Sequence, residues 1–286
     1  MPKYDLHTHF FTNPHRGKYS LETSSREPWF ILDAIKAARL DGIGFGNFGS
    51  FGTWKDAYEQ FSVRVKKGQL GGRYRVCREL ENALVFTDEK KEYKVIKIQE
   101  IPTLPKGKGH IVAIGLDKGE KIVGKTNCRG ILEQARNKGA VVNADHYSGF
   151  AGVGKERLEQ YNSLIDCFEG FNANYCHIAL APLLGLNPTK QEAEELAKEL
   201  GINWIATSDC HNTTDIGNGH IETEGDFDFS SANNLRESIR ATLTQRTFKP
   251  VCKQSNPLRS VLGHMIIYLY DTQIRNRMDW TNLESC

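Results

Sequence analysis

The sequence has no long apolar run. The stretch Met265 to Tyr270 is the longest late one, and it is far shorter than the roughly 20 residues that a membrane-spanning helix needs. The first residues, Met1 to His7, contain no apolar segment of the kind found in secretory signal peptides. We therefore expect a protein that neither crosses a membrane nor enters the export pathway.

The cysteines lack the spacing of a disulfide framework. Their number is odd and no two form a Cys-x-x-Cys pair; they are Cys77, Cys128, Cys167, Cys176, Cys210, Cys252 and Cys286. Scattered, unpaired cysteines are typical of proteins from reducing compartments. The sequence therefore predicts a cytoplasmic protein.

An excess of charge of one sign is also missing. The 37 Lys and Arg residues against 35 Asp and Glu residues give a net charge of +2. Surfaces that bind extended nucleic acid are usually strongly basic. This balance favours a small phosphorylated substrate or a nucleotide over long nucleic acid, although it leaves room for a local basic groove. Hydrophobic residues at 39% and charged residues at 25% are typical of a globular protein.

Short apolar segments alternate with helical patterns along most of the chain. Strands are expected near residues 5, 44, 97, 112, 142, 168 and 204. Helices are expected over 29–40, 126–138, 158–164, 189–200 and 232–243, with an interrupted helical stretch over 54–86. Such alternation is typical of a parallel sheet with crossover helices.

Seven strands suit one closed barrel better than two small domains. We therefore predict an α/β fold, a distorted seven-stranded (β/α)7 barrel similar to a TIM barrel, over residues 1–250. Residues 251–286 are predicted to form a C-terminal helical extension. This extension either caps the barrel or pairs two copies into a homo-oligomer, and the sequence leaves both open.

Potential metal ligands stand at the ends of the predicted strands. They are His7, His9, Glu100, His110, His146, Asp209 and His211. The carboxyl ends of parallel barrel strands meet at one rim, where active sites lie. Imidazole and carboxylate together suit zinc, manganese or iron. Each motif alone is weak, since a lone His-x-His is usually incidental and Asp209 also suits a helix N-cap. Their joint occurrence predicts a site for two or three divalent cations.

In this order, the residues resemble the PHP family (polymerase and histidinol phosphatase domains). The matching segments are Asp5-Leu6-His7-Thr8-His9, Gln99-Glu100-Ile101, Gly109-His110-Ile111, Asn143-Ala144-Asp145-His146, Phe168-Glu169-Gly170-Phe171-Asn172-Ala173 and Ala206-Thr207-Ser208-Asp209-Cys210-His211. The resemblance implies a distorted barrel with a site for two or three metal ions. It also implies phosphoester hydrolysis, with a metal-bound hydroxide as the nucleophile.

The resemblance further implies how the ligands divide. The ligands of the first cation are His7, His9, Glu100 and Asp209. Those of the second are His110 and His146, with Glu100 as the bridge. Those of the third are His211 and the loop histidine His15, which are also the candidate proton donors to the leaving group.

The chain departs from the family pattern at two places. Gly46-Asn47-Phe48 replaces the usual Thr-Asp-His, which puts the third cation in doubt. Asp145 and Tyr147 flank His146, where the family commonly has Ala-His-Pro. Asp145 either orients His146 or is only a polar residue at the rim.

Other assignments stay open at this point. Glu79 and Glu81 compete with Glu100 for the bridging role, but Glu100 is better placed just before His110. The loop over 44–52 carries aromatic residues that either stack on a base or pack on the barrel. Three basic residues either bind phosphate or are solvated surface charges: Lys155, Arg157 and Arg16.

The function favoured by these patterns is that of a metal-dependent phosphoesterase. Its substrate would be a phosphomonoester or a phosphodiester, such as a small phosphorylated metabolite, a nucleotide or an oligonucleotide end. One alternative is a metal-dependent amidohydrolase that cleaves a C–N bond, although such enzymes typically carry a metal-bridging lysine. Another alternative is a catalytically silent barrel with a binding or regulatory role.

Overall fold

The computed structural model describes residues 1–9, 12–13, 18–19, 28–48, 56–103, 109–124, 126–147, 152–173, 189–210 and 215–253. The helices of this part are α2 (Pro28–Ala37), α3 (Ala57–Lys66), α4 (Cys128–Asn137), α5 (Lys155–Tyr161), α6 (Lys190–Leu200) and α7 (Ala232–Gln245). None of these helices combines the length and the apolar composition that a bilayer crossing requires.

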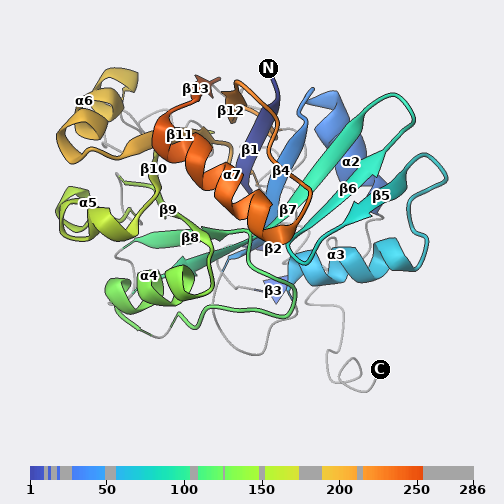
Figure 1. The fold of residues 1–286 in the computed structure, drawn as a ribbon, viewed down its shortest axis with the longest axis horizontal. Helices are drawn as coiled ribbons and strands as arrows, with labels where there is room; N and C mark the ends of the chain where they lie inside the picture. The colour runs from blue at the N-terminus through green and yellow to red at the C-terminus, as the bar shows by residue number, and fades with distance from the viewer. Residues whose placement is uncertain are drawn as a thin grey trace, which may run out of the picture.

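Seven strands form the wall of a nearly closed barrel (Figure 1). They are β1 (Lys3–Thr8), β4 (Gly42–Phe48), β7 (Glu92–Pro102), β8 (His110–Ile114), β9 (Val141–Asp145), β10 (Cys167–Asn172) and β11 (Asn203–Thr207). They are hydrogen-bonded in chain order, and the ring closes where Thr8 pairs with Cys210, just beyond β11. The predicted α/β barrel is therefore confirmed, and each of the seven predicted strands is present.

Further strands extend this wall. β12 (Gly219–Thr223) pairs with the start of β1, and β13 (Phe248–Cys252) continues the sheet beyond β12. β5 (Arg75–Glu79) and β6 (Ala83–Thr87) form a hairpin attached to β7. β2 (Thr12–Asn13) and β3 (Lys18–Tyr19) form a separate two-stranded ribbon. β13 runs through position 250, while residues 254–286, which hold most of the predicted C-terminal extension, lie outside the described part.

The predicted helical stretch over 54–86 is wrong beyond α3. Three glycines with positive φ, Gly68, Gly71 and Gly72, follow this helix and turn the chain. The next apolar segment, Ala83 to Phe86, is buried at every position, so it packs as a strand inside the sheet rather than as an amphipathic helix.

The sheet is not wholly parallel, which corrects the prediction. β8 runs antiparallel to both of its neighbours, β7 and β9, whereas the other wall strands pair in parallel. The connection between Pro102 and His110 is therefore short, as a hairpin connection is, and needs no crossover helix. The amino end of β8 consequently lies at the same rim as the carboxyl ends of the other strands.

Helix α7 covers the opposite end of the barrel. Its Arg236 donates to the carbonyl oxygen of Gly115, just after β8, and its Arg240 donates to those of Gly139 and Ala140, just before β9. Asp166, before β10, accepts a bond from the Val142 amide at 2.8 Å. These contacts hold α7 and the starts of β9 and β10 together at the base of the barrel.

Local sequence signals set the ends of α6. The side chain of Thr189 accepts a bond from the Glu192 amide, and the Glu192 carboxylate accepts one from the Thr189 amide, which makes a capping box. Gly201 ends the helix in the left-handed region, with φ at 67°. The chain then enters β11, which leads directly to Asp209.

Candidate metal centre

The rim opposite α7 gathers six of the eight predicted ligands. They are His7, His9, Glu100, His110, His146 and Asp209. All but His110 are buried with at most 6% exposure. The remaining two predicted ligands, His15 and His211, lie outside the described residues.

The reversed direction of β8 explains how His110 reaches this group. His110 is the first residue of β8, so a parallel β8 would place it at the base of the barrel. In the antiparallel pairing, His110 lies directly opposite Asp145, the last residue of β9. His110 therefore lies at the rim, as predicted. It does so because β8 is antiparallel, whereas the prediction assumed a parallel strand.

His7 and His9 turn the same ring atom toward the centre. Their Nε2 atoms are 2.7 Å apart. His9 Nδ1 donates to the carbonyl oxygen of Gly46 at 2.9 Å, and His7 Nδ1 lies 3.2 Å from Glu169 Oε1. With both Nδ1 hydrogens directed to acceptors, two Nε2 lone pairs would face each other at this distance. A cation or a proton between them removes the repulsion, so the pair fits a metal ion.

Glu100 has the position of a bridging carboxylate. Its Oε2 lies 2.8 Å from His9 Nε2, and its Oε1 lies 2.7 Å from His110 Nδ1. Oε2 therefore faces the pair formed by His7 and His9, and Oε1 faces His110. The rival carboxylates lie elsewhere: Glu79 pairs with Lys66 at the surface, and Glu81 is exposed.

His146 and Asp209 leave their strands in an unusual conformation. Their φ angles are 42° and 46°, which non-glycine residues rarely adopt. Such backbone strain concentrates at functional sites. The turn brings His146 Nε2 to 3.5 Å from Asp209 Oδ2, and Asp209 Oδ1 to 3.7 Å from the Nε2 atoms of both His7 and His9.

Glu169 on β10 is a site residue that the ligand prediction omits. Its Oε2 accepts a bond from His146 Nδ1 at 2.6 Å, while its Oε1 faces His7 Nδ1 and also binds the Thr207 hydroxyl. Asn172 donates to Glu169 Oε2 at 3.0 Å and to Asp209 Oδ2 at 3.2 Å. The signal for both residues is the Glu-x-x-Asn-Ala segment at the end of the strand.

Asp145 lies inside the group and not at the solvent side of the rim. It is fully buried, and its Oδ1 lies 3.0 Å from His146 Nδ1 and 3.3 Å from His7 Nδ1. Three overlapping sets of ligand atoms, each set within 4.8 Å, could hold a metal ion: Glu100, His110, Asp145 and His146; His7, His9 and Glu100; His7, Asp145 and Glu169.

The electrostatics of the group also fit cations. Burial would lower the pKa of His7, but the Asp145 and Asp209 carboxylates outweigh it and raise that pKa well above its usual value. Burial would raise the pKa of Glu100, yet His110 and the other histidines hold it well below its usual range. Burial and the Glu169 carboxylate raise the pKa of Asp145 well above normal. Positive charge is therefore favoured at this centre, whether it comes from protons or from metal ions.

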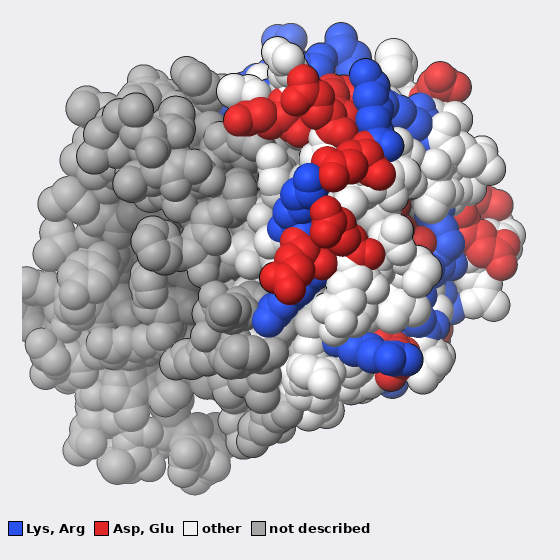
Figure 2. All heavy atoms as spheres, turned by 90° about the vertical axis from the view of Figure 1, so that its left-hand side faces the viewer, with Lys and Arg blue, Asp and Glu red and all other residues white. Residues whose placement is uncertain are grey.

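The residues considered for phosphate binding have other contacts. Lys155 binds both oxygens of Glu199 at 2.6 and 2.7 Å, on the side that carries α4, α5 and α6. Acidic and basic side chains are interspersed among the described residues of that side (Figure 2). Arg157 donates to the Thr103 hydroxyl at 3.0 Å, beyond the end of β7. Arg16 lies outside the described residues.

The glycine-rich segment belongs largely to β4. Phe45 packs edge-on against Phe61 of α3, with ring centroids 5.8 Å apart, so this aromatic residue packs on the barrel. Gly46 can hardly be replaced, because a Cβ there would lie 1.9 Å from the carbonyl oxygen of Ile98. Phe51 and Trp54, the other aromatic residues beyond β4, lie outside the described part.

Comparisons with known proteins give one family match over part of the chain and two solved structures of low sequence identity. A family model described as PHP-associated matches residues 188–244, the segment that holds β11 and Asp209. The crystal structure of PsfC from Pseudomonas syringae PB-5123 superposes with a TM-score of 0.57 at 13% identity, over 96% of this chain and 98% of PsfC. A structure of Endonuclease Q with a 27-mer duplex substrate gives a TM-score of 0.45 at 14% identity, over 85% of this chain and 56% of the other. No curated protein matches the sequence. The predicted resemblance to the PHP family is thus confirmed by the matched segment, and the chain has the fold of PsfC.

Proposed function

We propose that this protein is a metal-dependent phosphoesterase with two divalent cations at the rim. The observation that carries the proposal is the convergence of His7 Nε2, His9 Nε2 and the Glu100 carboxylate, within 3.7 Å of one another, on one buried point. Their other polar atoms are directed to the backbone or to neighbouring side chains, as is usual for metal ligands.

The residues would divide between the cations as follows. The first position takes His7, His9 and Asp209, the second takes His110 and His146, and Glu100 bridges them. Two such cations would supply Lewis acidity for phosphoester hydrolysis. The chain's own part is to fix the imidazole tautomers through Gly46 and Glu169, and to exclude bulk water from a buried site.

A C–N hydrolase with a bridging lysine finds no support in the described residues. Two lysines on the strand of Glu100 are buried. Lys94 lies near the start of β7, away from the rim, and its Nζ pairs with Asp226 at 2.8 Å. Lys97 is separated from Glu100 by an odd spacing, which places the two on opposite faces of β7. Its Nζ donates to the carbonyl oxygens of Asp117 and Glu120 at 3.0 and 3.1 Å, outside the barrel wall. Glutamate is thus the acid available for bridging.

The substrate class stays broad within this proposal. Small phosphomonoesters, nucleotides and oligonucleotide ends are included, and so is longer nucleic acid, because a balanced overall charge does not decide between them. His15 and His211 remain proposed ligands of a third cation or proton donors to the leaving oxygen. A reducing, cytoplasmic location is likewise proposed from the cysteine pattern.

The experiment combines metal analysis with hydrolysis assays. The purified protein is loaded with manganese, zinc or iron and tested on a phosphomonoester, a phosphodiester and single-stranded and duplex DNA. We expect about two metal ions per chain and turnover that Glu100→Gln abolishes. Glu79→Gln is the matched control, since it removes an exposed carboxylate. Two bound ions without turnover on any phosphoester would instead favour the silent barrel.

A further inference from the structure

Asp145 is a buried carboxylate that the proposed ligand set does not use. It is the last residue of β9 and directly opposite His110 on β8. Residues directly opposite each other in an antiparallel pair present their side chains on the same face. The backbone therefore directs Asp145 and His110 to the same side, toward the centre.

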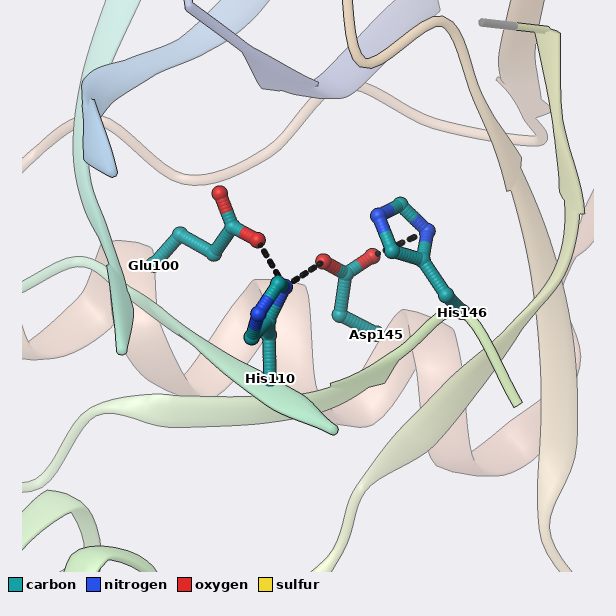
Figure 3. A group of neighbouring side chains, drawn as sticks. All are labelled: Glu100, His110, Asp145 and His146. Carbon is teal, nitrogen blue, oxygen red and sulfur yellow. Dashed lines mark ion pairs between the residues drawn. The ribbon is translucent and has the colours of Figure 1, made fainter. Parts of the chain in front are cut away.

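The side chain of Asp145 lies between the two histidines of the second cation position (Figure 3). Its Oδ1 is 3.0 Å from His146 Nδ1, and its Oδ2 is 3.8 Å from His110 Nδ1. Glu100 approaches His110 from the other side, at 2.7 Å. The four side chains thus surround one small volume.

Neither oxygen of Asp145 is in hydrogen-bond geometry with a donor of the described residues. His146 Nδ1 lies closer to Glu169 Oε2, at 2.6 Å, than to Asp145 Oδ1. An ionised carboxylate that is fully buried without hydrogen bonds is costly unless a cation compensates it. A purely structural aspartate would be expected to accept at least one such bond, as Asp166 does from the Val142 amide.

We propose that Asp145 is a protein ligand of the second cation, together with His110, His146 and the bridging Glu100. Both cation positions then have the same donors: two histidines, one carboxylate of their own and the shared glutamate. The proposal rests on the metal site of the proposed function, but it is independent of the substrate. It also explains the departure from the Ala-His-Pro pattern, because alanine offers no donor.

The added carboxylate has a consequence for metal preference. Oxygen donors suit Mn²⁺ well, whereas Zn²⁺ binds strongly through imidazole alone. Loss of the Asp145 charge should therefore weaken Mn²⁺ binding at the second position more than Zn²⁺ binding. The first position, which uses Asp209, should be unaffected.

The test is a titration of the full chain with Mn²⁺, followed by electron paramagnetic resonance, in wild type and Asp145→Asn. We expect two Mn²⁺ per chain and a spin-coupled spectrum in wild type. In Asp145→Asn we expect one tightly bound Mn²⁺, a mononuclear six-line spectrum, and at least a 10-fold weaker second site. The Zn²⁺ affinity should fall less. Asp117→Asn is the control, because it removes a partly exposed carboxylate beyond the other end of β8.

Two Mn²⁺ bound to folded Asp145→Asn with wild-type affinity would overturn the proposal. If the variant does not fold, an anomalous difference map of the Mn²⁺-loaded wild-type crystal decides, since an Asp145 carboxylate outside bonding distance of both ions excludes it. The two proposals fail separately. If Asp145→Asn loses the spin coupling but the wild type shows no turnover, only the phosphoesterase proposal is refuted. If the wild type turns over phosphoesters but Asp145→Asn binds Mn²⁺ as the wild type does, only the role of Asp145 as a ligand is refuted.

Discussion

Glu169→Gln is the substitution that probes the centre most directly. Glu169 accepts from His146 Nδ1 at 2.6 Å and faces His7 Nδ1 at 3.2 Å, so one carboxylate orients a histidine of each cation position. Removal of such a partner of a metal-ligating histidine typically costs 10–100-fold in metal affinity, or about 1.4–2.7 kcal/mol per site.

The geometry predicts different results for two variants. Glutamine has one accepting oxygen, so one histidine keeps its acceptor while the other meets an NH₂ group, which is a second donor. Glu169→Gln should therefore weaken one of the two cations by about 10–100-fold and leave the other near its wild-type affinity. Glu169→Ala should weaken both.

Calorimetric titration with Co²⁺ measures the two affinities, and long-range ¹⁵N correlation spectra of the Zn²⁺-loaded protein report the histidine tautomers. In wild type we expect His7 and His146 to carry the hydrogen on Nδ1. Glu133→Gln is the control, because it removes an exposed carboxylate that pairs with Arg129 on α4. A folded Glu169→Ala protein with two unchanged affinities and unchanged tautomers would refute the reasoning.

Three further outcomes test other parts of the structure. Chelation of the bound ions should lower the melting temperature by about 5–10 °C, because a ligand at 100 times its Kd stabilises the folded protein by about 2.7 kcal/mol. An unchanged melting curve would argue against a cation site. Asp166→Ala should lower the free energy of unfolding in urea by about 1.5–3 kcal/mol, since the Val142 amide loses its charged acceptor and the partly exposed Arg136 and Arg240 lose their contacts at 3.0 and 3.3 Å. Metal content per folded chain should not change. Alkylation of the native protein with peptide mapping should label the exposed Cys77 before the buried Cys128, because burial raises the pKa of the Cys128 thiol to about 11; equal rates would contradict the packing.

The barrel could be predicted from the sequence because its strands are short, apolar and separated by well-marked helices. The direction of each strand within the sheet could not be predicted, since the same pattern of apolar residues suits a parallel or an antiparallel strand. β8 shows this: its apolar pattern predicts a strand, and only the short connection after Pro102 hints at a reversal. The β5–β6 hairpin was missed because its glycine-rich approach resembles an interrupted helix.

The convergence of these histidines and acids at one rim could be predicted because they recur at one kind of position. Glu169 lies in the quoted Glu-x-x-Asn-Ala segment but was left out of the ligand set, because the sequence does not show which side chains it will contact. Its partners, His7 and His146, are 162 and 23 residues away and come together only in the closed barrel. The burial of Asp145 likewise depends on β8 lying beside β9, which periodicity does not reveal.

The two cation positions differ in how much of the chain they join. Glu100, His110 and His146 come from β7, β8 and the end of β9, which are consecutive along the wall, so their half of the centre can assemble from one hairpin and the connection through α4. His7 and His9 meet Asp209 across the seam between β1 and β11, where the described residues show a single isolated bridge, Thr8 to Cys210. Closing a loop of about 200 residues costs chain entropy before any contact compensates it, so this half should form late in folding. A cation held there would act as a clasp that fastens the first strand of the chain to the last strand of the wall.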